Sequence, residues 1–230
     1  MRLASNTPST VEEGRLIASD VADQLNMLCH IRKTPNILYG IFTELLKQFY
    51  SNTHNIPIEL PAGTVYTVNK NTTGIWIDSE LQWDVDAIEF RPAIYVGLQD
   101  INYSSVTGKQ TGRIGMDLKQ GERIYARRGE GVVTFNHVGS QQGEGVAYAG
   151  ATLDFLDAFS DVIRDEFNFE TFALIRLTPI QVEKESKERY KSIVAFKFTF
   201  QDTWTIKIES PKLKKVVFSA GQNLFESGIV

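Results

Sequence analysis

One stretch near the C-terminal end constrains the fold more than any other part of this chain. Residues 194–208 read VAFKFTFQDTWTIKI, in which every even-numbered position but one is apolar and most odd-numbered positions are polar. Because successive side chains of a β-strand point to opposite faces, this period of two predicts a strand with one apolar and one solvated face. Asp202 is the even-numbered exception. A carboxylate on the apolar side predicts a bulge, a bend or a hairpin corner at that residue.

The composition is that of an ordinary globular chain. Of the 230 residues 42% are hydrophobic and 23% are charged, which suits one large domain or two small ones. Lys and Arg number 24 against 28 Asp and Glu, so the net charge of −4 offers no basic excess to attract nucleic acid. No apolar run reaches the roughly 20 residues of a membrane helix, and no secretory signal is expected. Cys29 is the single cysteine, so a reducing cytosol, or a particle assembled in it, is the expected compartment.

Three amphipathic helices are expected. Thr10 and Glu13 fit a capping box that opens a helix ending near His30. Asn36 is expected to cap a second helix, in which apolar residues form a wide stripe over residues 37–49. A third helix is expected over residues 146–167, where apolar residues repeat at spacings of three and four. Its opposite side carries Asp154, Asp157, Asp161 and Asp165.

Strands and loops are expected between these helices. Residues 91–98, 131–138 and 172–177 have the composition of strands, and residues 99–113 are typical of a long polar loop or a hairpin arm. Between residues 56 and 88, Pro and Gly separate strand-like pieces at 64–68 and 74–77. The predicted fold class is α+β, a mixed or antiparallel β-sheet flanked by amphipathic helices, with a β-rich insertion in the N-terminal half. The predicted domains are an N-terminal helical segment (1–55), the β-rich insertion (56–90) and an α+β domain with a C-terminal tail (91–230).

Motifs for catalysis and ligand binding are incomplete. Residues 139–145 are rich in glycine, but no Lys follows as in a phosphate-binding loop, and Tyr148 stands where a dinucleotide-binding loop has its third glycine. His137 ends an apolar strand and is expected to be a structural hydrogen-bonding residue. Four acidic residues could surround a calcium ion, although their spacing does not match an EF-hand: Asp78, Glu80, Asp84 and Asp86. We expect no catalytic residue, no cofactor and no metal site.

Two other functions stay open at this point. A magnesium-dependent nuclease site could be drawn from Asp165, Glu185 and Lys187, although the last two lie in a charged connector. A β-rich carbohydrate- or receptor-binding module could use Trp76, Trp83 and Trp204, which have Asp and Asn neighbours.

Arginine alternates with an aromatic residue in one short stretch. Arg123, Arg127 and Arg128 surround Tyr125, an arrangement that nucleic-acid-binding surfaces use. Because the chain as a whole is acidic, contact with an acidic protein surface fits at least as well. We expect no sequence-specific nucleic-acid binding and no membrane contact.

From Arg91 onward the order of elements resembles that of tail terminator and tail completion proteins, which act at the head–tail neck of tailed bacteriophages. The resemblance rests on Arg91-Pro92, residues 131–135, residues 144–159, and residues 196–208 with Asp202-Thr203-Trp204 at their centre. It implies a sheet flanked by helices and a ring, typically a hexamer, at the head-proximal end of the tail tube. Such a ring stops tube growth and joins the tail to the head. Residues 1–90 exceed what a minimal family member needs.

The resemblance also implies partners and a location. A family member is a non-enzymatic virion protein, assembled in the host cytoplasm, which contacts the tail tube protein and head-completion or neck proteins. Exposed sheet edges and the loop at residues 99–113 could pair with neighbouring copies by strand addition. The candidate interface residues are Ser104, Lys109, Arg113, Arg123, Arg127, Arg128, Phe218 and Phe225.

Overall fold

The computed structural model describes residues 33–57, 60–61, 63–69, 71–82, 91–106, 112–117, 122–139, 143–179, 181–182 and 190–207. In chain order its elements are α2 (Pro35–Ser51), a 3₁₀ turn (Thr53–Asn55), β1 (Trp76–Ser79), a second 3₁₀ turn (Glu80–Gln82), β2 (Ala93–Leu98), β3 (Asn102–Ser105), β4 (Arg113–Asp117), β5 (Glu122–Gly139), α4 (Glu144–Ala158), α5 (Ser160–Glu166), β6 (Phe169–Leu177), β7 (Gln181–Val182) and β8 (Tyr190–Lys207).

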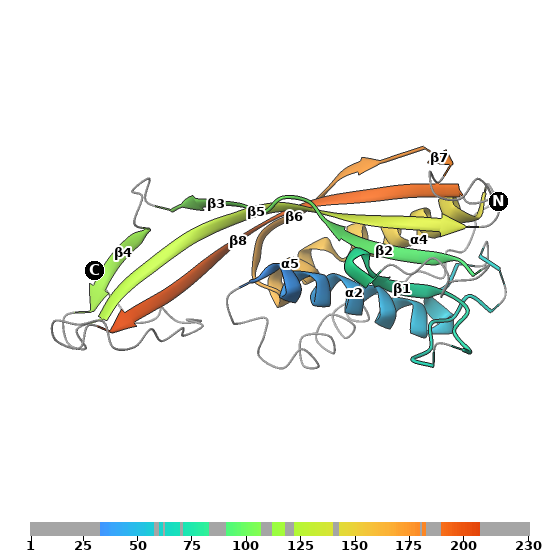
Figure 1. Cartoon of the computed structure of the whole chain (residues 1–230), viewed down its shortest axis with the longest axis horizontal. Helices are drawn as coiled ribbons and strands as arrows, with labels where there is room; N and C mark the ends of the chain where they lie inside the picture. The colour runs from blue at the N-terminus through green and yellow to red at the C-terminus, as the bar shows by residue number, and fades with distance from the viewer. Residues whose placement is uncertain are drawn as a thin grey trace.

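These strands form one mixed sheet. Its order is β1-β2-β5-β8-β6, with β3 and β4 beside β5 and β7 beside β8. β1 and β2 are parallel, and the other pairs are antiparallel. Figure 1 shows α2, α4 and α5 on one face of this sheet. The predicted α+β class is therefore confirmed.

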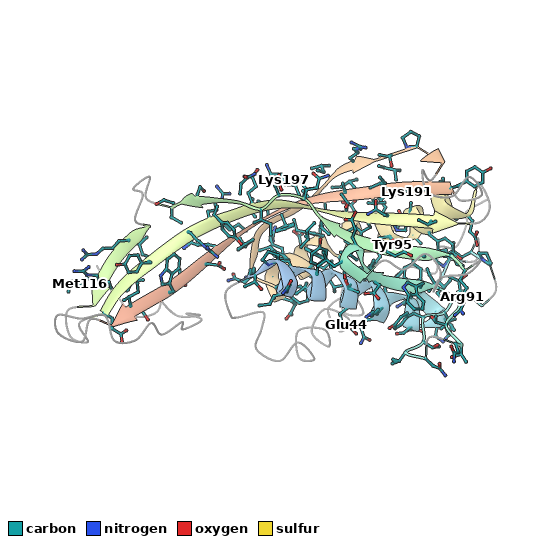
Figure 2. The ribbon with its side chains drawn as sticks, in the orientation of Figure 1. Glu44, Arg91, Tyr95, Met116, Lys191 and Lys197 are labelled. Carbon is teal, nitrogen blue, oxygen red and sulfur yellow. The ribbon has the colours of Figure 1, made fainter. Side chains whose placement is uncertain are left out.

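The two longest strands confirm the period of two in the sequence. β5 and β8 pair along their whole lengths, from Glu122 opposite Lys207 to Gly139 opposite Tyr190. The even-numbered residues of β8 point toward the helices in the body of the molecule, where Val194, Phe196, Phe198 and Phe200 are fully buried. Lys197, on the opposite face, forms an ion pair of 2.6 Å with Glu130 (Figure 2).

The apolar stripe of α2 fills the space under this sheet. Its buried residues include Leu38, Ile41, Phe42, Leu45, Leu46 and Phe49, as predicted. The predicted cap at Asn36 is wrong, because the helix begins two residues earlier. Thr34 is the cap, its hydroxyl accepting a hydrogen bond from the Ile37 N–H at 3.4 Å, and Pro35 follows, where a missing N–H costs nothing.

The predicted helix over residues 146–167 is two helices. The chain leaves helical geometry at Phe159, which has φ −108° and ψ 16°, between the end of α4 and the start of α5. Both helices bury the same side, so one spacing of three and four runs through the break. The buried residues are Phe155, Leu156, Phe159, Ile163 and Phe167. Asp154, Asp157, Asp161 and Asp165 are exposed on the other side, as predicted.

The described part of the N-terminal half contains less β-structure than its sequence predicts. Residues 64–68 are not a strand, although a turn follows them, with the Thr72 N–H donating to the Asn69 carbonyl at 3.0 Å. β1 does form, and it pairs with β2 as part of the main sheet. The domain boundaries stay predictions, and the helix expected at residues 10–30 lies outside the described residues.

The segment at residues 99–113 is not simply a loop. β3 and the start of β4 both pair with the first half of β5, so half of the described part of this segment belongs to the sheet. We call the extension made by β4, residues 122–128 of β5 and residues 201–207 of β8 the arm. In Figure 1 the arm projects well beyond the ends of the helices.

Candidate interaction surface on the arm

The inner face of the arm continues the face that the helices cover in the body. The register between β5 and β8 is unbroken, so residues of the same parity keep to the same face along both strands. In the body this face carries Val133 and Phe135 of β5 opposite Phe196 and Val194 of β8. In the arm it carries Arg123, Tyr125 and Arg127 opposite Ile206, Trp204 and Asp202. In Figure 1 no described helix lies over this part of the sheet.

Two glycines mark the point where the body becomes the arm. Gly129 lies opposite Phe200, and Gly131 lies opposite Phe198. A Cβ on Gly129 would clash with the ring of Phe200, and one on Gly131 would come within 2.9 Å of Phe198. The absence of side chains at these positions lets both rings lie flat across β5.

The next residue pair on the same face, Arg127 and Asp202, forms an ion pair. Both Nε and Nη2 of Arg127 donate to Oδ2 of Asp202, at 3.3 and 3.0 Å. The other carboxylate oxygen accepts a hydrogen bond from the backbone N–H of Lys33, at 3.2 Å. We call Lys33, Arg127 and Asp202 the clasp, because they join the start of α2 to the root of the arm. The predicted bulge or hairpin corner at Asp202 is wrong, because the pairing with β5 continues without a shift. These partners satisfy the buried carboxylate.

Aromatic rings hold the arginine of the clasp in place. Its guanidinium carbon lies 4.0 Å from the ring centre of Tyr103 and 5.9 Å from that of Trp204. Trp204 in turn stacks on Tyr125, with the ring centres 5.7 Å apart and the planes 10° from parallel. Such contacts restrict a guanidinium to one orientation. Trp204 is therefore part of a half-buried stack on the arm and not of the main core.

Farther along, the arm presents cations and apolar groups that are exposed. Arg113 lies opposite Tyr125, and Met116 lies opposite Arg123, so all four share the inner face. Ile114 and Met116 each expose 41% of their surface. Neither Arg113 nor Arg123 makes an ion pair with any residue that the structure describes. Figure 2 shows Met116 at the far end of the arm.

The structure separates the candidate interface residues into three groups. Ser104, Arg113 and Arg123 are exposed. Arg127 belongs to the clasp, and Arg128 Nε forms an ion pair of 2.7 Å with Glu170. Lys109, Phe218 and Phe225 lie outside the described residues. Sequence reasoning missed Met116 and Trp204 as neighbours of the cations, because β4 and the first half of β5 were not recognised as strands and strand pairing is not a local property.

A second apolar patch lies on the body. Leu174, Ile175 and Leu177 of β6 are exposed, and a shallow groove beside them is lined by Val146, Leu177, Thr178, Pro179 and Ser192. β6 pairs with β8 along one side only among the described strands. Sheet edges of this kind are common sites of protein contact.

The residues considered for enzyme chemistry do not converge within the described part of the chain. Asp165 is exposed and pairs with Arg164 at 3.3 Å, while Glu185 and Lys187 lie outside the described residues. No group of three or more His, Cys, Asp or Glu side chains that could hold a metal ion occurs among the described residues. Of the tryptophans considered for carbohydrate binding, Trp76 is buried, Trp83 lies outside the described residues and Trp204 is in the stack.

One histidine has a strongly shifted pKa, for a structural reason. His137 is completely buried, and its Nε2 lies 2.8 Å from the hydroxyl of Thr152, which lies 3.1 Å from the hydroxyl of Tyr50. Burial lowers the pKa of His137 to about 3. A neutral imidazole therefore links β5 to α4 and α2, and the prediction of a structural hydrogen-bonding residue is confirmed.

This histidine makes stability depend on pH. In the unfolded chain the imidazole takes up a proton near its ordinary pKa of 6.5, whereas in the folded chain it does so only near 3. Its contribution is complete above pH 6.5 and is lost as the pH falls toward 3, at about 1.4 kcal/mol per pH unit. The free energy of unfolding should therefore fall by about 2 kcal/mol more between about pH 6.5 and pH 5 in the wild type than in His137→Gln. Urea unfolding at the two pH values measures this difference, and equal losses in both proteins would contradict it.

Comparison with known proteins provides no functional assignment for this chain. No protein-family model matches the chain, and no curated protein matches it. Among the described residues, no helix is both long enough and apolar enough to cross a membrane.

Proposed function

We propose that this protein is a structural component of a tailed-phage virion, which forms a ring at the head-proximal end of the tail tube and joins the tail to the head. The observation that carries the proposal is the arm. A three-stranded extension of the sheet leaves the helix-covered body and presents Arg113, Met116 and Arg123 on a face that helices cover elsewhere in the same sheet. Exposed apolar groups rimmed by charge mark surfaces that meet another protein.

The resemblance to tail terminator and tail completion proteins supports the choice of partner. The residues that carry it now have positions: residues 131–135 and 196–207 lie on the two long strands, and residues 144–159 comprise α4 and the break that follows it. In this proposal the body supplies the wall of the ring and the arm reaches a neighbouring subunit. The tail tube protein and head-completion or neck proteins would contact the two rims.

The protein alone and the protein mixed with isolated tail tubes test this proposal. Mass photometry should find a species several-fold heavier than the 25.9 kDa chain. Negative-stain microscopy should find added density at one end of each tube and an arrest of further tube growth. A chain that stays monomeric and leaves tube ends bare would refute the proposal. Bovine serum albumin at the same concentration controls for non-specific adsorption to tubes.

A further inference from the structure

The inner face of the arm has the width of one helix. Neighbouring strands lie about 4.8 Å apart, so the outer strands of a three-stranded arm are about 10 Å apart. A helix with its side chains is about 10–12 Å across. In the body this same face receives α2 and α4, and Trp204, Ile206 and Met116 extend its apolar character into the arm. An added helix would therefore continue the packing that the sheet already uses.

The charge of the arm indicates what kind of helix fits. Arg113 and Arg123 bring two guanidinium groups to the inner face, and neither has an acidic partner within the described residues. An occupant that supplies carboxylates at the spacing of a helix surface would pair with them. Arg127 takes no part in this, because Asp202 already neutralises it.

The outer face of α4 has the complementary property. Asp154 and Asp157 are exposed one turn apart, and neither forms an ion pair within the described part of the chain. On α5, by contrast, Arg164 pairs with both Asp161 and Asp165, at 3.0 and 3.3 Å. Partial burial and the neighbouring Asp157 raise the pKa of Asp154, so a cation brought to this pair would relieve their repulsion.

The contact cannot form within one chain. α4 packs its buried side, which includes Tyr148, Thr152 and Phe155, against β5 and β8 of its own sheet. Its acidic side therefore points away from that sheet, and the arm projects beyond the helices in Figure 1. The inner face of the arm and the acidic side of α4 cannot contact each other within one chain, but they can do so between two copies.

We propose that the inner face of the arm binds the acidic outer face of α4 in a second copy of this chain, with Arg113 and Arg123 facing Asp154 and Asp157. The contact joins two different surfaces, so each subunit offers one of each, and repetition closes into a ring when the rotation per subunit allows it. The inference rests on the proposed function only in that it names the contact from which the ring would be built.

Charge reversal tests this pairing directly. We expect the arm variant Arg113→Glu/Arg123→Glu and the helix variant Asp154→Lys/Asp157→Lys each to raise the dissociation constant of self-association at least tenfold. The variant that combines all four changes should recover most of the wild-type association, because the signs are complementary again. Sedimentation velocity over a concentration series measures the association, and circular dichroism verifies the fold. Lys197→Glu, at a partly exposed position on the opposite face of β8, is the control for altered net charge.

The possible results distinguish failure of the proposed subunit contact from failure of the proposed virion function. If only the arm variant loses association, the arm binds another surface, such as the edge of β6, and the inference is overturned. Association that survives both reversals, or is not recovered in the combined variant, overturns it as well. A wild type that is monomeric in solution but still caps tail tubes overturns the inference and leaves the virion function standing. Association that obeys the charge reversals in a protein that ignores tubes supports the inference and refutes the tail function.

Discussion

Replacing Phe42 by alanine is expected to lower the free energy of unfolding by about 3–5 kcal/mol, the range for truncating a large buried aromatic residue. Phe42 is fully buried on α2, and its ring centre lies between 5.5 and 6.1 Å from the rings of Phe135, Phe169, Phe172 and Phe198. These four come from β5, β6 and β8, so the truncation opens a cavity where the helix meets three strands. Urea unfolding followed by far-UV circular dichroism measures the loss.

A matched truncation at a partly exposed site distinguishes the cost of opening a buried cavity from the cost of removing apolar atoms in general. Val146→Ala removes apolar atoms from a residue of α4 that keeps 40% of its surface exposed. This change should lower the free energy of unfolding by less than about 1 kcal/mol, because little surface is buried there. Equal losses for both variants would mean that Phe42 does not hold the helix to the sheet.

Replacing Asp202 by alanine is expected to lower the free energy of unfolding by about 2–4 kcal/mol. The side chain of Asp202 is 4% exposed and that of Arg127 is 19% exposed, so removing the carboxylate leaves a largely buried guanidinium without its counter-charge. The N–H of Lys33 loses its acceptor in the same step. Chemical unfolding measures the effect, and the change in tryptophan fluorescence between wild type and variant, to which Trp204 contributes, reports whether the stack on the arm loosens.

A double substitution distinguishes an unpaired charge from lost packing. Replacing both partners, as in Arg127→Met/Asp202→Leu, removes the charge along with its counter-charge and should recover much of the loss. If the double variant is as unstable as Asp202→Ala, the ion pair itself is not the cause. If Asp202→Ala is neutral, the clasp contributes nothing to the attachment of the arm.

Those elements whose signal lies within a few consecutive residues were predictable from the sequence. The alternation in residues 194–208 and the stripe over residues 37–49 each report the surface of one strand or helix, and burial follows directly from them. The four aspartates at residues 154–165 were recognised as an exposed face for the same reason, even though the helix that carries them is broken at Phe159. A break that leaves both halves facing one core does not disturb the spacing.

The first half of β5 and the strands beside it could not be predicted in this way. Within residues 122–128, Arg123 and Arg127 lie on one face of the strand, while Ile124 and Ala126 are buried on the other. The charged residues interrupt the apolar pattern by which a strand is recognised in a sequence. The sequence therefore indicated a basic stretch where the structure has a sheet. Because β3 and β4 each pair with β5, their existence depends on a partner elsewhere in the chain.

What the sequence by itself determined is the class of the fold, the apolar faces that form its core and the acidic face of α4 and α5. What only the tertiary structure decided is the arm, the clasp that attaches it and the place where its exposed cations lie. The reason is that periodicity is a local property, whereas strand pairing and charge pairing join distant residues. Asp202 illustrates this: by pattern it is a defect in a strand, and in the folded protein Arg127 and the N–H of Lys33 satisfy it.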